Sequence, residues 1–186
     1  MKTTRLFIFL LFISSFAFSQ KFVDVELIKM NDEVIHSRMR VFTNLFNRKL
    51  IDDVSFYKAA VLVDEKGKKK EKIKAKEIKS LSFTNFNDIP MKYVNDGTQL
   101  KILVYDGKIK WFKRINRNIM DGSISYFDYL VNEEGKVFNL GLFNHRKNKL
   151  NEALKNNPKL IKEIEDTRMD DLDLLGVLER YDEMMK

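Results

Sequence analysis

The chain has 186 residues, of which 33% are charged and 44% hydrophobic, with a formal net charge of +7 and no cysteine. Without cysteine it forms no disulfide and offers no thiol for the lipid of an exported lipoprotein. The basic excess does not indicate a nucleic-acid partner, because its densest run, Lys66 to Lys79, has eight lysines, no arginine and two glutamates. We expect a solvated lysine-rich hairpin there, and a fold that depends on a hydrophobic core.

Residues 1–19 have the pattern of a cleavable export signal. Lys2 and Arg5 supply the charged start, and Leu6 to Phe18 supply the apolar stretch. A small-x-small end follows, which predicts cleavage by a signal peptidase before Gln20.

A membrane anchor is the alternative interpretation of this segment. The apolar stretch is too short for it, because a spanning helix needs about 20 apolar residues and Ser14 and Ser15 interrupt this run. We therefore predict an exported soluble protein, periplasmic or secreted, with no membrane span after signal cleavage. The remaining 167 residues suit one domain with a sizeable core.

Charge is unevenly distributed along the mature chain. Residues 163–183 carry nine acids and two bases, whereas the preceding body is basic. Opposite charges within one chain attract each other, so we expect the acidic end to dock on the basic body. An external partner for each half is the alternative.

Alternating apolar residues and turn signals predict four β-hairpins in the body of the chain. They pair residues 22–27 with 34–41, 54–63 with 70–75, 100–105 with 108–115, and 123–131 with 136–142. In the second hairpin, Lys72 and Lys74 alternate with Ile73, which places the lysines on the solvent face and discourages edge pairing.

The third hairpin has the clearest signal, because its strands flank the turn dipeptide Asp106-Gly107. Strict alternation predicts that Leu103 and Tyr105 share one face of this hairpin. Trp111, the one tryptophan of the chain, is predicted to lie in the core.

Three short helices are predicted after His145, where the apolar period lengthens to three or four residues. The first ends near residues 156–157, the second starts with Asn157 as N-cap before Pro158, and the third starts near Asp170. Their apolar stripes are predicted to pack on the body of the chain.

The predicted fold class is α+β and mainly β, an antiparallel sheet or partly closed barrel of hairpins with two to three C-terminal helices packed on it. We assign residues 1–19 to a cleavable signal peptide, 20–145 to an antiparallel β domain and 146–186 to a C-terminal helical subdomain of the same folding unit.

Four segments resemble an uncharacterised family of small exported bacterial proteins. They are the strand-turn-strand opening at 25–41, the apolar strand and Gly turn at 100–108, the Tyr-Phe-Asp-Tyr-Leu-Val strand at 126–131, and the closing helix at 174–182. The chain departs from the family pattern at Ser37, where glycine is usual, and at Asp182, where asparagine is frequent. The resemblance implies export and a β-rich architecture with a helical C-terminal region, and it transfers no activity and no functional residue.

Candidate catalytic groups are few. His36 and His145 are far apart in sequence, and neither lies in an H-E-x-x-H motif. The serines lack the G-x-S-x-G pattern of an activated nucleophile. We therefore assign no catalytic residue, no metal ligand and no cofactor.

Three pairs of adjacent acids keep a hydrolase open as an alternative, since glycoside hydrolysis needs two carboxylates across a cleft. The pairs are Asp52-Asp53, Glu133-Glu134 and Asp170-Asp171. Adjacent acids on a strand face opposite ways, and these lie at predicted turns or a helix start, where solvation or capping explains them.

The sequence favours a noncatalytic binding or interaction module of the cell envelope or exterior. If it is such a module, exposed aromatics at Tyr93, Tyr126, Phe127 and Tyr129 are the expected contact set. The alternative is that these aromatics lie in the core of the sheet, which alternation and β propensity favour. A small hydrolase that uses paired carboxylates and a carrier of a small apolar ligand are the alternatives. The partner is an unknown envelope or extracellular protein or a small ligand, and not nucleic acid.

Overall fold

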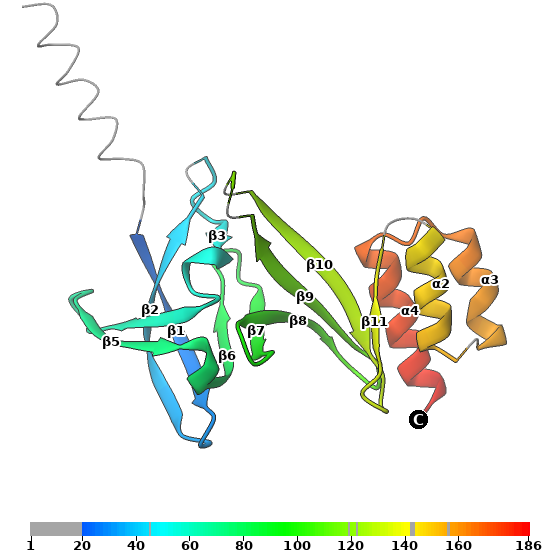
Figure 1. Cartoon of the computed structure of the whole chain (residues 1–186), viewed down its shortest axis with the longest axis horizontal. Coiled ribbons are helices and arrows are strands. Elements are labelled where there is room, and N and C mark those ends of the chain that lie inside the picture. The colour runs from blue at the N-terminus through cyan, green and yellow to red at the C-terminus, as the bar shows by residue number, and fades with distance from the viewer. Residues whose placement is uncertain (1–19, 45, 119, 122, 142–143, 156) are drawn as a thin grey trace, which may run out of the picture. The chain divides into compact units, whose positions relative to one another are not determined.

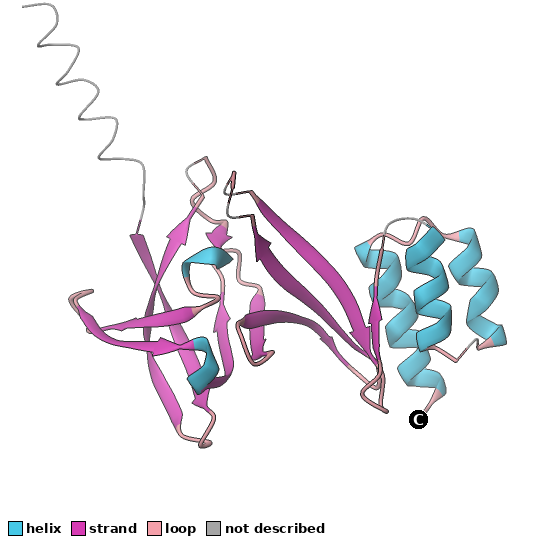
Figure 2. Cartoon of the chain, in the orientation of Figure 1, coloured by secondary structure: helices cyan, strands magenta, loops and turns pink. Residues whose placement is uncertain are grey.

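A computed structural model describes residues 20–186 apart from positions 45, 119, 122, 142–143 and 156 (Figure 1). The predicted export signal at 1–19 lies outside the described residues. The described residues form eleven β-strands and three α-helices, and the helices follow the strands (Figure 2). The chain is therefore α+β and mainly β. It divides into two compact units, Met1–Leu100 and Lys101–Lys186.

The N-terminal unit is an antiparallel sheet in the open order β7-β6-β1-β2-β4-β5, with β3 paired to β2. The bounds are β1 (Gln20–Lys29), β2 (Val34–Thr43), β3 (Ile51–Asp52), β4 (Ala59–Val63), β5 (Lys69–Lys74), β6 (Ile78–Thr84) and β7 (Pro90–Asn95), with 3-10 turns η1 (Asp53–Ser55) and η2 (Ala75–Glu77).

Strands β1 and β2 confirm the first predicted hairpin, with Val25 opposite Ser37. Alternate residues of β1 point into the core, so Val25 and Leu27 are buried. The chain turns through Asp32, whose φ of 64° lies in the left-handed region that aspartate tolerates.

The second hairpin is shorter than predicted, because residues 54–58 form a 3-10 turn and a bend and β4 starts at Ala59. Asp52 caps that turn by accepting a hydrogen bond from the backbone N–H of Val54 at 3.1 Å. On β5, Ile73 is buried opposite Ala60, while Lys72 and Lys74 are exposed. The predicted alternation of lysine with apolar residues is confirmed.

Strands β6 and β7 are not in the sequence-based prediction. A β-bulge explains the omission of β6, because Ile28 pairs with Ser80 and Lys29 pairs with Ile78, which leaves Lys79 as an extra residue. The bulge separates the buried Ile78 from the buried Leu81 by three positions and so breaks the alternation of two that marks a strand.

The C-terminal unit is an antiparallel sheet in the open order β11-β10-β9-β8, followed by three helices. The bounds are β8 (Leu100–Asp106), β9 (Lys110–Arg117), β10 (Ile124–Val131), β11 (Val137–Asn139), α2 (Asn144–Ala153), α3 (Pro158–Asp166) and α4 (Asp171–Met184). The strands confirm the third and fourth predicted hairpins. The turn of the third differs from the prediction, because Asp106 is still paired with Lys110 and the connection is formed by residues 107–109 rather than by Asp106-Gly107.

The helix starts also agree with the prediction. The side chain of Asn157 caps α3 by accepting from the N–H of Lys159, and Pro158 occupies the first helical position. The side chain of Asp170 accepts hydrogen bonds from the N–H groups of Leu172 and Asp173, and the side chain of Asp173 accepts one from the N–H of Asp170. This capping box fixes where α4 begins.

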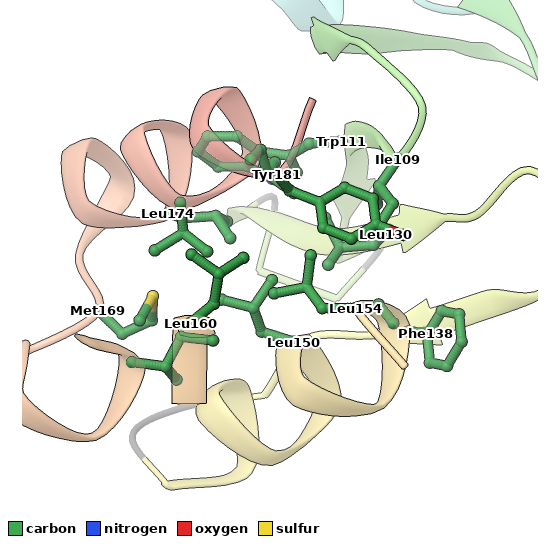
Figure 3. Packing of buried hydrophobic residues seen from close by; sticks show 14 residues of the cluster. Ile109, Trp111, Leu130, Phe138, Leu150, Leu154, Leu160, Met169, Leu174 and Tyr181 are labelled. Atoms are coloured by element: carbon green, nitrogen blue, oxygen red, sulfur yellow. The ribbon is translucent and has the colours of Figure 1, made fainter. Parts of the chain in front are cut away.

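The helices pack on the sheet through one apolar cluster, shown in Figure 3. Trp111 of β9 and Leu130 of β10 are buried from the sheet side. Leu150 of α2, Leu160 of α3 and Leu174 of α4 are buried from the helix side. This packing confirms the predicted core position of Trp111 and the predicted docking of the C-terminal helices.

One face assignment of the third hairpin is wrong. Leu103 pairs with Phe112, but Tyr105 pairs with Trp111, so a bulge lies between them. Phe112 and Trp111 point to opposite faces of β9, and paired residues share a face. Leu103 and Tyr105 therefore lie on opposite faces, with Tyr105 on the helix side.

We expect Leu174→Ala to lower the free energy of unfolding by about 2–5 kcal/mol, because Leu174 is fully buried between α4 and the sheet. Leu172→Ala is the matched control on the same helix, since that side chain is 80% exposed, and its effect should stay within about 0.5 kcal/mol. Denaturant unfolding measures both. Equal losses would contradict the helix-on-sheet packing.

Candidate functional site

The four predicted contact aromatics do not form one surface. Tyr93 is fully buried in the N-terminal unit, so it belongs to the core of the sheet, as the alternative expected, and not to an exposed contact set. Its ring meets Phe56 edge-on at 5.0 Å and stacks on Phe83 at 5.6 Å. Its hydroxyl donates to Asp53 Oδ1 at 2.7 Å. Tyr93 is a core residue with a satisfied polar tip, as buried tyrosines usually are.

The other three aromatics lie on β10, on two different faces. Successive strand residues alternate, and Leu130 is buried under the helices, so Tyr126 lies on the helix side of the sheet. Phe127 and Tyr129 lie on the opposite side. Tyr126 is 48% exposed and Phe127 is 56% exposed. Phe127 and Tyr129 therefore share a surface from which Tyr126 is excluded.

Two further residues complete that surface. Phe112 of β9 lies opposite Tyr129, and their rings stack with centroids 5.3 Å apart and planes 26° apart. Lys101 Nζ lies 4.2 Å from the centroid of Phe112 and 5.1 Å from that of Tyr129. The cation caps the stacked pair in the geometry of a cation–π contact.

Arg114 adds a second cation to this side of the sheet, since it lies opposite Phe127 in the β9–β10 register. We call Lys101, Phe112, Arg114, Phe127 and Tyr129 the aromatic face. Among the described strand residues that the register places on this side, Asp106 is the one acidic residue. It forms an ion pair with Lys110 at 2.8 Å. The aromatic face therefore combines π surface with an excess of positive charge.

Phe112 and Lys101 are absent from the sequence-based contact set. Phe112 is found from the β9–β10 register, which places it opposite Tyr129. The position of Lys101 Nζ above both rings depends on side-chain conformation and has no sequence signal.

On the helix side, Trp111 forms the centre of a charged network rather than a ligand site. Its Nε1–H donates to Asp128 Oδ1 at 2.9 Å. Lys113 and Arg146 lie 5.1 and 5.8 Å from its ring centroid. Both cations pair with Asp171 of α4. The network joins β9, β10, α2 and α4 around one buried indole.

The pKa of the Asp171 carboxyl is lowered. Burial alone would raise it, but the hydrogen bonds and charges of Lys113 and Arg146 outweigh that effect. Because the pKa of Asp171 is lower in the folded state than in the unfolded state, its carboxylate stabilises the fold above the ordinary titration range of aspartate. This stabilisation is lost as the pH falls through the lowered pKa. Asp171 therefore has a structural role in docking α4.

Asp182 provides a second polar link between α4 and the sheet. It accepts from the Tyr105 hydroxyl at 2.8 Å and from the N–H of Lys108 at 3.1 Å. A Cβ at Gly107 would overlap the Asp182 carboxylate, so glycine is required at this turn for the approach of the helix. Burial, the hydrogen bond to Asp182, and the negative charges around it raise the pKa of Tyr105 to about 12.

The remaining acids of the adjacent pairs also have contacts that account for them. Glu133 pairs with Lys108 at 3.4 Å, and Glu134 pairs with Lys155 at 2.8 Å. Asp52 and Asp170 cap helical turns, Asp53 accepts from Tyr93, and Asp171 pairs with two cations. These contacts give the hydrolase alternative no added support.

The histidines lie in different units, His36 on β2 and His145 on α2, and both are exposed. In the described part of the chain, no group of three or more acidic, histidine or cysteine side chains is placed to hold a metal ion. The α-helices that the structure describes are each too short or too polar to cross a membrane.

Comparison of the chain with protein-family models, with curated proteins and with solved structures finds no match. The resemblance to an exported bacterial family therefore stays a prediction.

We expect the spectrophotometric titration of the wild-type chain to differ from that of Tyr105→Phe by one ionisation at about pH 12, which is that of Tyr105. An unfolded tyrosine ionises near pH 10, so the contact stabilises the fold below about pH 10 and is lost as the pH rises to about 12. Asp182→Asn should lower the pKa of Tyr105, because it removes a charge and weakens the bond. A Tyr105 that titrates near pH 10 in the folded protein would contradict the docking contact.

Proposed function

We propose that this protein is an exported, noncatalytic binding module of the cell envelope or exterior, and that the aromatic face is its contact surface. Export is supported by the pattern of residues 1–19. The contact surface is supported above all by Phe127, which is 56% exposed beside the stacked Phe112–Tyr129 pair.

The composition of the aromatic face fits a protein partner. Interface cores are enriched in aromatic residues and arginine, and a few large aromatic anchors carry most of the binding energy. Phe127 supplies an exposed anchor. Tyr129 is half-buried and stacks on Phe112, which is only 6% exposed and holds Tyr129 in place, so Tyr129 loses little side-chain entropy on binding.

The charge of the aromatic face defines the chemistry of the partner further. Lys101 and Arg114 carry positive charge beside the rings, and Asp106 is already paired with Lys110. The complementary surface is a folded protein with an apolar patch flanked by acidic side chains. Flat stacked rings on a sheet also suit such a surface better than they suit a buried small ligand.

The two alternatives have less support. A carrier requires a closed barrel with an unfilled interior, whereas both units have sheets with open strand orders. A carboxylate hydrolase requires two acids facing one cleft, whereas the adjacent acids contact cations or backbone groups.

Photo-crosslinking in the source cell tests the proposal. A benzophenone side chain at position 127 should cross-link one protein that mass spectrometry identifies, because that side chain points out of the aromatic face. The same group at position 126 is the matched control, since the two positions are adjacent and similarly exposed but lie on opposite faces. Cross-linking of that protein from position 126 alone would overturn the assignment of the face.

The purified partner then gives the energetic test. Phe127→Ala should weaken its affinity by roughly 30-fold, which is the effect of losing one aromatic anchor. Arg114→Glu should also weaken the affinity, and the loss should be larger at low salt than at high salt, because salt screens the charge. Tyr126→Ala should leave the affinity unchanged. An affinity that is insensitive to Phe127→Ala would overturn the proposal.

A further inference from the structure

The N-terminal unit carries a second exposed apolar cluster, at the end of the sheet where β1 begins. Two loops meet there, residues 44–50 between β2 and β3 and residues 85–89 between β6 and β7. Phe46 is 95% exposed, Leu50 is 53% exposed and Ile89 is 52% exposed. Phe46 lies within the first loop, whereas Leu50 and Ile89 are the residues at which the two loops close.

Lys21 of β1 holds the two loops next to each other. Its Nζ donates to the carbonyl oxygen of Arg48 at 2.9 Å and lies 4.6 Å from the ring centroid of Phe86. One cation thus contacts the first loop through a hydrogen bond and the second through a cation–π contact. The exposed tips of both loops therefore belong to one surface.

The exposed position of Phe46 follows from a defined loop. The N–H of Phe46 donates to Asn44 Oδ1 at 2.9 Å, and the N–H of Lys49 donates to Asn47 Oδ1 at 3.1 Å. The loop closes where the N–H of Asn44 donates to the carbonyl of Leu50 at 2.9 Å. These side-chain turns fix the backbone while leaving the phenyl ring in solvent.

The second loop has the same kind of organisation. Asn85 Oδ1 accepts from the N–H groups of Asn87 at 2.9 Å and of Ile89 at 3.1 Å. Asp88 adopts a φ of 61°, which completes the tight turn. In residues 46–50 and 85–89, these hydrogen bonds hold the backbone that carries the apolar side chains, which lowers the entropy cost of a contact.

The charges around the tips have one predominant sign. The described residues of the two loops, with the first two residues of β1, include three cations and one acid. The cations are Lys21, Arg48 and Lys49, and the acid is Asp88. A positive ring around separate, protruding apolar side chains matches a negatively charged bilayer surface, which accepts such tips at the headgroup level.

We propose that this end of the N-terminal unit docks on an anionic lipid bilayer, with Phe46, Leu50 and Ile89 inserting at the interface and Lys21, Arg48 and Lys49 facing the headgroups. The exposed apolar side chains come from two separate loops, which fits a planar lipid interface better than the packed core of a protein interface. This contact is additional to the protein-binding role of the aromatic face and does not depend on it.

Vesicle co-sedimentation tests the proposal with protein that begins at Gln20. Vesicles of one part phosphatidylglycerol to two parts phosphatidylcholine should bind it, and phosphatidylcholine vesicles should bind it much less. Phe46→Ser should lower the partition coefficient by about tenfold, because the one fully exposed aromatic tip is lost. Arg48→Glu combined with Lys49→Glu should lower it by at least about tenfold.

Matched controls distinguish the effect of these two loops from the effects of losing any exposed apolar side chain and of changing the net charge. Met30→Ser removes a side chain that is 59% exposed at a different turn of the same unit, and it should leave the partition coefficient unchanged. Lys72→Glu with Lys74→Glu makes the same charge change on β5, away from the two loops, and should have a much smaller effect. Equal losses from the two double variants would overturn the proposal in favour of nonspecific charge attraction.

A spectroscopic measurement gives a second readout. Phe46→Trp should show a blue-shifted emission on addition of the anionic vesicles, while Trp111 stays buried in the other unit and contributes a constant signal. An unshifted emission despite vesicle binding, or no binding to anionic vesicles at all, would overturn the proposal. Phe127→Ser should leave vesicle binding intact, so failure of the aromatic face and failure of the lipid contact are distinguishable.

Discussion

The burial of Trp111 beneath the helices is the constraint that organises the C-terminal unit. Once this indole and Leu130 face the helices, strict alternation along β9 and β10 sends Phe112, Phe127 and Tyr129 to the other side. The aromatic face is thus a geometric consequence of the core. Because a one-residue slip would reverse every side chain, the Asp128 bond to Trp111 also protects the register.

The packing of the helices on Trp111 also brings acids of the C-terminal segment into contact with groups of the same unit, so these acids are not available to a basic partner. Two acids hold α4 against the sheet. Asp171 pairs with Lys113 and Arg146, and Asp182 accepts a hydrogen bond from the Tyr105 hydroxyl. Asp170 and Asp173 are used in the capping box. The expected attraction between the acidic end and the basic body is therefore realised inside one unit, by hydrogen-bonded pairs rather than by a diffuse field.

The sequence predicted those parts of the fold whose signals are local. Asn157-Pro158 and Asp170 specify helix starts, because each acts through backbone conformation or capping within a few residues. The dipeptide Asp106-Gly107 located the third hairpin, although the turn itself is formed by residues 107–109. Strands β6 and β7 could not be predicted in this way. The extra residue at Lys79 is explained only by pairing with β1, which is distant in sequence.

The contact residues show the same division between local and distant information. The exposure of Phe127 follows from its place in the β10 alternation, but the burial of Tyr93 follows from Phe56, Phe83 and the carboxylate of Asp53, which no spacing rule connects to it. Aromatic residues on strands satisfy β propensity whether they lie in a core or at an interface. Only the tertiary neighbours decide between the two roles.

Each unit has its own buried core and its own exposed aromatic surface, and this separation shapes the energetics. Phe46 lies on a loop fixed by asparagine turns, and Phe127 lies on a strand fixed by pairing, so neither side chain is needed for the core of its unit. Substitutions at such sites change folding stability little and add independently when they share no partner.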